Sequence, residues 1–193
     1  MREREIPSWT VALICGASGV GKTSAARALA NRYGAALGEA DDIVTALKAL
    51  TTAEHLPALH FWDNHPQAAT WPAEQIAALH LSVAEELTPA FAAVIADHLE
   101  YDARVVLEGD FLLPGLALGL GPRVRAVVLT DAHESIVSNY HAREPNRGPQ
   151  DIRASVGVLI TAALTHRAEH EVPIVAARPW QDSLARIDAA LSA

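Results

Sequence analysis

Residues 16–24 read GASGVGKTS and follow directly on the apolar run WTVALIC at residues 9–15. The stretch contains the pattern G-x-x-x-x-G-K-[ST] in full, between a predicted strand and an alanine-rich segment, 24–34, that favours a helix. Glycines let the backbone bend until several N–H groups point at one anion, and the start of the following helix adds its positive end. The stretch therefore predicts a loop that holds a nucleoside triphosphate, rather than a chance glycine-rich turn.

In this hypothesis Lys22 reaches the β- and γ-phosphates and the hydroxyl of Thr23 ligates Mg²⁺. The sequence has no N-K-x-D guanine box and no serine-glycine-glycine signature of transporter ATPases, and it is short for an AAA-type motor. These absences leave a compact phosphoryl-transfer enzyme with ATP and Mg²⁺ as cofactors, although the choice between ATP and GTP stays open. The predicted nucleotide-binding residues of the loop are Gly16, Ala17, Ser18, Gly19, Val20, Gly21, Lys22, Thr23 and Ser24.

Composition excludes several other classes. The formal net charge of −8 over 193 residues argues against nonspecific nucleic-acid binding, which needs a basic face. Cys15 is the only cysteine and cannot form an intramolecular disulfide, which favours a reducing compartment. No signal peptide is evident, and no run reaches about 18 apolar residues without a charge or a helix breaker. We therefore expect a cytoplasmic protein that does not span a membrane.

Short apolar runs alternate with longer helical patterns, which indicates parallel βαβ units with both faces of the sheet covered. Pro89 must kink or split the helix predicted over 72–99. No linker marks a second domain, so 1–193 is predicted to be one kinase domain, with a lid at 141–150 and an acceptor-binding insertion at 51–100. The predicted strands are 9–15, 35–40, 103–110, 123–131 and 172–177, and the other predicted helices are 24–34, 44–50, 133–142, 151–171 and 182–193.

Acidic residues follow two of the strands, and ligands of such sheets bind at these carboxyl ends. In EADDI (39–43), Asp41 is a candidate base for the acceptor hydroxyl, while Asp42 either orients the acceptor or caps a helix that begins at Ile43. In VVLEGD (105–110), Glu108 is predicted to hold a water of Mg²⁺ or to act as base, and Asp110 to contact substrate. The alternative is that these acids are simply exposed strand ends.

Arginines and aromatic residues suggest the rest of the site. Arg143 and Arg147 lie in a polar loop that can close over the phosphates, or whose arginines pair with nearby acids. Arg178 and Trp180 are predicted to stack on adenine, unless the tryptophan belongs to the core. The acceptor pocket is predicted, from position alone, to include Trp62 and His80, together with Asp42 and Asp110.

The motifs GASGVGKTS, ADDI, VVLEGDFLLPG and IVAARPW, with the arginine-bearing loop, resemble the nucleoside-monophosphate-kinase-like group of P-loop small-molecule kinases. Within that group, LEGDFLLPG is similar to 2-phosphoglycerate kinases. The resemblance covers most of the chain in motif order and implies a three-layer α/β/α fold with a central parallel sheet of about five strands. It also implies ATP and Mg²⁺ as cofactors and Arg143 and Arg147 as lid residues.

The sequence therefore predicts an ATP-dependent kinase that phosphorylates a hydroxyl of a small metabolite. Lys22, Asp41, Asp42, Glu108, Arg143 and Arg147 are its predicted catalytic residues. One alternative is an antibiotic, aminoglycoside or sugar phosphotransferase, since Asp110 favours a neutral or cationic acceptor over an anionic one. Another is a nucleotide-dependent regulatory ATPase or binding protein. The expected partner is a small molecule, neither nucleic acid nor membrane, and the chain is expected to be a monomer or homodimer.

Overall fold

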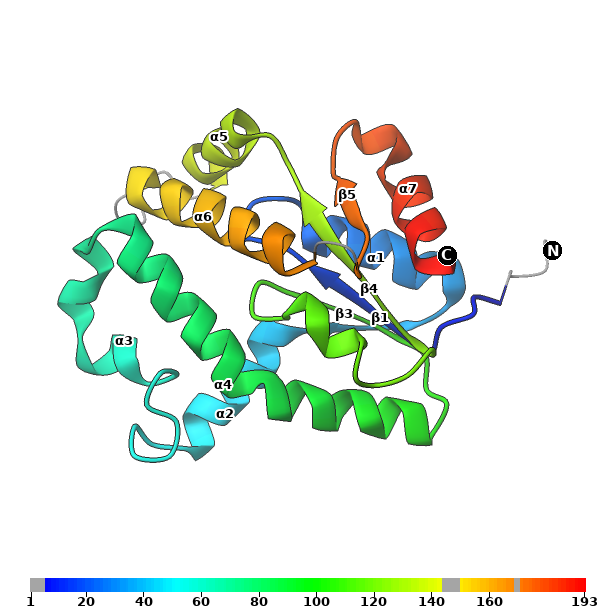
Figure 1. Ribbon diagram of the computed structural model, residues 1–193, viewed down its shortest axis with the longest axis horizontal. Helices are drawn as coiled ribbons and strands as arrows, with labels where there is room; N and C mark the ends of the chain where they lie inside the picture. The colour runs from blue at the N-terminus through cyan, green and yellow to red at the C-terminus, as the bar shows by residue number, and fades with distance from the viewer. Residues whose placement is uncertain (1–5, 144–149, 169–170) are drawn as a thin grey trace.

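A five-stranded, wholly parallel sheet forms the centre of the computed structural model, which describes residues 6–143, 150–168 and 171–193 (Figure 1). The strand order is β2-β3-β1-β4-β5, so the first strand of the chain lies in the middle of the sheet. The prediction of a parallel sheet of about five strands is confirmed. The strands are β1 (Val11–Cys15), β2 (Ala36–Glu39), β3 (Val105–Gly109), β4 (Val124–Thr130) and β5 (Ile174–Ala176).

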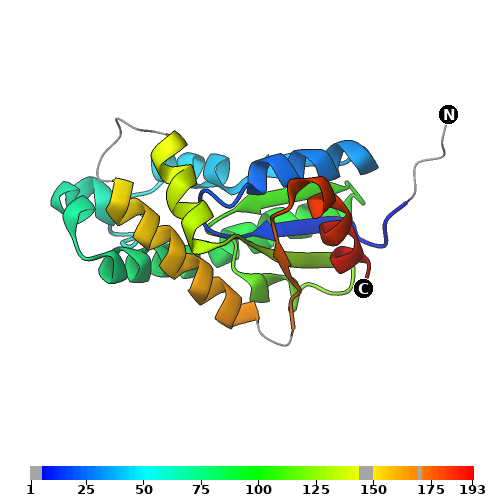
Figure 2. The same ribbon diagram turned by 90° about the horizontal axis from the view of Figure 1, so that it is seen from above.

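Helices cover both faces of the sheet, as expected for strands whose residues are nearly all apolar and buried. α1 and α7 pack together on one face, and α4 and α6 pack together on the other (Figures 1 and 2). The helices are α1 (Lys22–Tyr33), α2 (Ala40–Leu50), α3 (Phe61–Asn64), α4 (Ala73–Glu100), α5 (His133–Arg143), α6 (Gln150–Ala168) and α7 (Trp180–Ser192), with short 3₁₀ helices η1 (Pro66–Thr70) and η2 (Pro114–Ala117).

α1 begins at Lys22, inside the glycine-rich motif and two residues before the predicted start. Its first backbone N–H groups therefore belong to the loop itself, and the positive end of the helix dipole lies there. The helix ends as predicted at Gly34, whose left-handed backbone (φ 64°) donates its N–H to the carbonyl of Ala30.

α4 stays one continuous helix through Pro89, so it is not split. Figure 1 shows the helix changing direction partway along its length, which agrees with the predicted kink. Among the described residues, α4 is the one helix long and apolar enough to cross a membrane by length and composition. Core helices such as α4, which buries Leu87, Phe91 and Ile95, meet the same criteria, so this is weak evidence of a span. The expected cytoplasmic location stays a prediction.

The segment predicted as an irregular insertion, 51–71, contains the single-turn helices α3 and η1. Its backbone is tied to α4, because Glu86 accepts hydrogen bonds from the backbone N–H groups of Ala58 and Leu59. Phe61 stacks on His65 within the segment, with ring centroids 4.1 Å apart. These contacts hold the insertion against the N-terminal half of α4, near the carboxyl ends of the strands (Figure 1).

Candidate active site

The glycine-rich loop joins β1 to α1 and surrounds the side chain of Lys22. This side chain is only 8% exposed, and its Nζ donates a hydrogen bond to the carbonyl of Ala17 at 3.0 Å. The hydrogen bond holds the ammonium group against the loop. A buried cation beside several backbone N–H groups attracts an anion strongly, because little water screens it.

Thr23 and Glu108 meet at the mouth of this loop. The hydroxyl of Thr23 donates to Oε1 of Glu108 at 2.5 Å, and the glutamate is 5% exposed at the end of β3. The pairing of β1 with β3 sets Ile14 beside Glu108, which explains why residues so far apart in sequence meet. Burial raises the pKa of Glu108, although the hydrogen bond from Thr23 and the charge of Lys22 oppose the shift.

This pair fits the site of a magnesium ion. Mg²⁺ prefers oxygen ligands and typically takes only one or two from the protein, the rest coming from water and substrate phosphates. Thr23 supplies one oxygen and Glu108 supplies a carboxylate within hydrogen-bonding distance of it. In the part of the chain that the structure describes, no group of three or more His, Cys, Asp or Glu residues is arranged to hold a metal ion.

Gly109 allows α2 to approach the end of β3. A Cβ at this glycine would lie 2.3 Å from the Cβ of Ala40, the first residue of α2. The close approach places Asp41, in the first turn of α2, within electrostatic range of Asp110 and Lys22. Loss of hydration, followed by repulsion from Asp110, raises the pKa of the Asp41 carboxyl, and Lys22 partly offsets the shift.

The prediction that Asp42 caps a helix beginning at Ile43 is wrong. α2 begins three residues earlier, at Ala40, because the chain turns into the helix directly after β2. Asp42 therefore lies within the first turn, where its charge favours the helix dipole without capping it. Its side chain is exposed, as is that of Asp41, and neither of the two lines the cavity described next.

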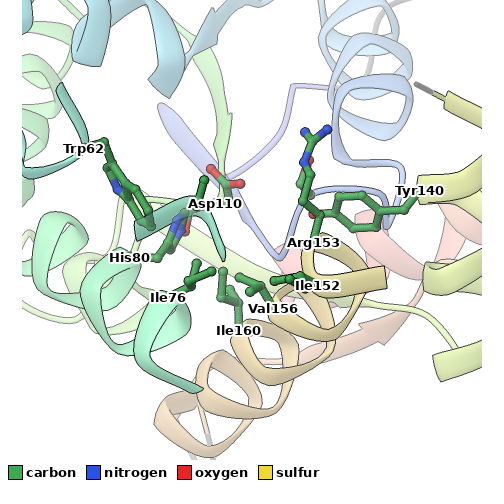
Figure 3. Close-up of a pocket in the computed structure, with 11 residues that line it drawn as sticks. Trp62, Ile76, His80, Asp110, Tyr140, Ile152, Arg153, Val156 and Ile160 are labelled. Carbon is green, nitrogen blue, oxygen red and sulfur yellow. The ribbon is translucent and has the colours of Figure 1, made fainter. Parts of the chain in front are cut away.

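A cavity of about 450 Å³ opens beside the phosphate loop (Figure 3). Three of the four predicted acceptor-binding residues, Trp62, His80 and Asp110, line it, and so does Ser18 of the loop. His80 donates from Nε2 to the backbone carbonyl of Asp110 at 3.0 Å and stacks on Phe111, with centroids 4.3 Å apart. The histidine thus anchors the turn that carries Asp110.

Sequence reasoning did not assign the opposite wall of the cavity, which α5 and α6 supply. Arg153 and Tyr140 lie there together, with the guanidinium 5.6 Å from the ring centroid (Figure 3). Arg153 follows the arginine-bearing loop in sequence, and this proximity was the one signal available for it. The apolar residues that line the rest of the cavity look like ordinary helix core in the sequence: Ile76 of α4 and Ile152, Val156 and Ile160 of α6.

The predicted lid falls mainly outside the described residues. Arg147 lies in the segment 144–149, which the structure does not describe. Arg143 is the last residue of α5, and its side chain is likewise outside the description. The roles proposed for these two arginines therefore stay predictions.

The predicted adenine-binding pair lies after β5. Arg178 donates from Nε to Asp131 at 3.0 Å, and its guanidinium lies 5.4 Å from the ring centroid of Trp180. The two side chains contact each other, so a base between them would require them to separate. The ring of Trp180 also lies against Gly21 and borders a second cavity of about 420 Å³ with Ser24 and Leu184. An adenine could therefore stack beside Trp180, close to the phosphate loop.

Solved structures with the same fold include several small-molecule kinases. A gluconokinase from Sinorhizobium meliloti matches with a TM-score of 0.57 and 17% identity over 97% of this chain and 93% of its own. A sugar kinase from Janibacter matches with a TM-score of 0.55 and 18% identity, over 95% of this chain and 94% of its own. A shikimate kinase from Bacteroides thetaiotaomicron matches with a TM-score of 0.52 and 11% identity, over 93% of this chain and 96% of its own.

The chain has the fold of P-loop small-molecule kinases. Because the matches cover 93–97% of each chain, this fold accounts for nearly the whole of the protein. No protein-family model and no curated sequence matches it. The finer resemblance to 2-phosphoglycerate kinases is not confirmed and stays a prediction.

We expect Gly21→Ala to destabilise this kinase fold by about 1–3 kcal/mol, because Gly21 has a φ of 91° that other residues adopt only with strain. The added Cβ would also lie 2.0 Å from the Trp180 ring, which must swing away. Urea denaturation measures the loss. Gly115→Ala is the control, since no atom lies within 4 Å of its added Cβ. Equal free energies of unfolding for the two variants would contradict the assigned loop conformation.

Proposed function

We propose that the protein is an ATP-dependent kinase that transfers the γ-phosphoryl group to a hydroxyl of a small metabolite. The observation that carries this proposal is the position of Ser18, which belongs to the phosphate loop and also lines the adjacent cavity. A donor in the loop and an acceptor in the cavity would lie side by side, which is the main requirement of phosphoryl transfer. The names of the matched gluconokinase, sugar kinase and shikimate kinase support a small hydroxylated acceptor.

In this proposal Lys22 and the loop amides hold the β- and γ-phosphates of ATP. Mg²⁺, when bound at Thr23 and Glu108, would neutralise phosphate charge. The acceptor oxygen forms a bond to the γ-phosphorus as the bond to the bridging oxygen of ADP breaks. The hydroxyl proton passes to Asp41, and ADP leaves.

Cations around the phosphates would stabilise the departing charge. We assign this role to Arg143 and Arg147, and add Arg153 because it lines the cavity from α6. Adenine would stack on Trp180, with Arg178 held in place by Asp131, whose side chain is 2% exposed. Closure of the loop that carries the lid arginines would exclude water and so limit hydrolysis of ATP.

Acceptor-stimulated release of ADP tests the proposal. A coupled assay with purified protein, Mg²⁺ and ATP is run with and without panels of sugars, sugar acids, phosphoglycerates, amino alcohols and aminoglycosides. A kinase should show stimulation with at least one class. Nucleotide binding with no stimulation by any class would favour the regulatory ATPase instead.

We expect kcat/KM to fall on the acid side at a higher pH than an ordinary aspartate would impose, because the pKa of Asp41 is raised. As pH drops through this raised pKa, the base becomes protonated and can no longer accept the hydroxyl proton. Asp110 and Glu39 raise the pKa of Asp41, whereas Lys22 and His80 lower it. Asp110→Asn removes one negative charge and should move the acid limb to lower pH. If the pH at which kcat/KM falls is the same or higher in the Asp110→Asn variant, Asp41 is not the base.

A further inference from the structure

Asp110 lines the cavity beside Trp62 and His80 (Figure 3). Its backbone carbonyl is held by His80, but in the described part of the chain no hydrogen bond or ion pair engages the carboxylate itself. Asp41 lies close enough for the two charges to repel, and Glu39 adds a third negative charge, while Lys22 and His80 offset part of this repulsion at Asp41. The cation that lines the cavity, Arg153, lies across from this end, beside Tyr140 (Figure 3). A ligand with a positive charge would relieve the repulsion at the acidic end.

The floor of the cavity is apolar. Ile76 comes from α4, and Val156 and Ile160 come from α6, where the two helices pack together (Figure 3). A fully hydroxylated ligand would leave its polar groups unpaired against these side chains, which costs binding free energy. An apolar ligand body would instead bind favourably there, because contact with these side chains removes its apolar surface from water.

We propose that the acceptor is an amino alcohol with an apolar body, whose protonated nitrogen pairs with Asp110 while its body lies on Ile76, Val156 and Ile160. We place the reacting hydroxyl near the nitrogen, because Asp41, the proposed base, lies within electrostatic range of Asp110. This inference rests on the proposed kinase function and names the class of its acceptor. Asp110 is then the residue that sets the charge specificity.

Three probes with one apolar tail test the charge requirement: an aminohexanol, a hexanediol and a hydroxyhexanoate, each with its two polar groups on neighbouring carbons. Binding is measured by calorimetry with Mg²⁺ and a non-hydrolysable ATP analogue present, and phosphorylation by ADP release with ATP. The amine should bind about tenfold more tightly than the diol, as expected for a charge-assisted hydrogen bond, and the carboxylate most weakly. Equal binding of amine and diol, or a preference for the carboxylate, would overturn the proposal.

Two variants assign the preference to one side chain. Asp110→Asn should reduce the amine-to-diol ratio to less than about threefold, as expected when the charge is removed and the hydrogen-bonding shape is kept. The control Asp97→Asn, an exposed carboxylate on the distal half of α4, should leave the ratio unchanged. If Asp110→Asn keeps the full preference, another group recognises the charge and the assignment of Asp110 fails.

Tail length tests the apolar floor. Replacing the aminohexanol by aminoethanol should weaken binding by about fourfold for each methylene removed, as expected when each methylene is buried. No dependence on tail length would overturn the apolar-body assignment. Stimulation of ADP release only by polyols or sugar acids would overturn this inference but leave the kinase function standing. If no nucleotide binds, the kinase function fails, and the probes' binding without nucleotide still decides which charge the cavity prefers.

Discussion

Replacing Lys22 with alanine should lower kcat by on the order of a thousandfold, as expected when the main cation on a transferring phosphoryl group is removed. The ammonium group is buried in the loop, where water screens its charge little. The fold should survive, because the side chain of Lys22 is tied to the loop by a hydrogen bond to the carbonyl of Ala17 alone among the described residues, and alanine favours a helix. Steady-state kinetics on the best acceptor, with thermal denaturation of the same preparation, measures both effects.

Arg27→Ala is the matched control for this variant. Arg27 is an exposed cation on the same helix, so its loss changes the net charge equally without touching the loop. Its kcat should stay within about twofold of the wild type, as is usual for surface substitutions away from the site. A Lys22→Ala protein that turns over like Arg27→Ala would show that the loop does not hold the donor.

Asp41→Asn should lower kcat by about a hundredfold to ten-thousandfold, the usual contribution of a positioned general base. Asparagine keeps the shape and hydrogen-bonding capacity of the side chain but cannot accept the hydroxyl proton. Binding of the ATP analogue should change little, because the carboxylate faces the acceptor rather than the phosphates in our proposal. Single-turnover kinetics at saturating substrates isolates the chemical step.

The neighbouring Asp42→Asn gives the sharpest comparison. The sequence leaves Asp41 and Asp42 as rivals, and Asp41 lies within electrostatic range of both Lys22 and Asp110. Asp42→Asn should therefore reduce kcat by less than about fivefold, in the range of substitutions that touch no reacting group. The opposite result, a large loss at Asp42 and a small one at Asp41, would assign the base to Asp42.

The central sheet was predictable because its signals are local. Except for β2, which reads ALGE, each strand is a mostly apolar short run, and the phosphate loop is a contiguous motif whose glycines and lysine need no distant partner to be recognised. The bounds of the elements were less predictable than their existence. The run at 9–15 forms a strand only from Val11, and the helix predicted from residue 44 begins at Ala40. A helix that begins without a capping side chain leaves little signal in the sequence, and neither α1 nor α2 has a side-chain cap at its start.

The acceptor cavity was predicted only in part, because it depends on long-range packing. Trp62, His80 and Asp110 were found from their order between strands, and the structure brings them to one cavity. Arg153 and the isoleucines of the floor were not assigned, since their role follows from the packing of α6 against α4. A helical apolar stripe has the same appearance in sequence whether it faces a core or a ligand cavity.

Calorimetric titration of the protein with Mg²⁺ and a non-hydrolysable ATP analogue tests the central claim most directly. The account predicts one site per chain with a dissociation constant between about 1 µM and 1 mM, the range of enzyme substrates. It also predicts that Lys22→Ala weakens this binding and that Arg27→Ala does not. If the wild-type protein shows no binding at any accessible concentration, the glycine-rich loop holds no nucleotide, and the roles assigned to Thr23, Glu108 and Asp41 are wrong.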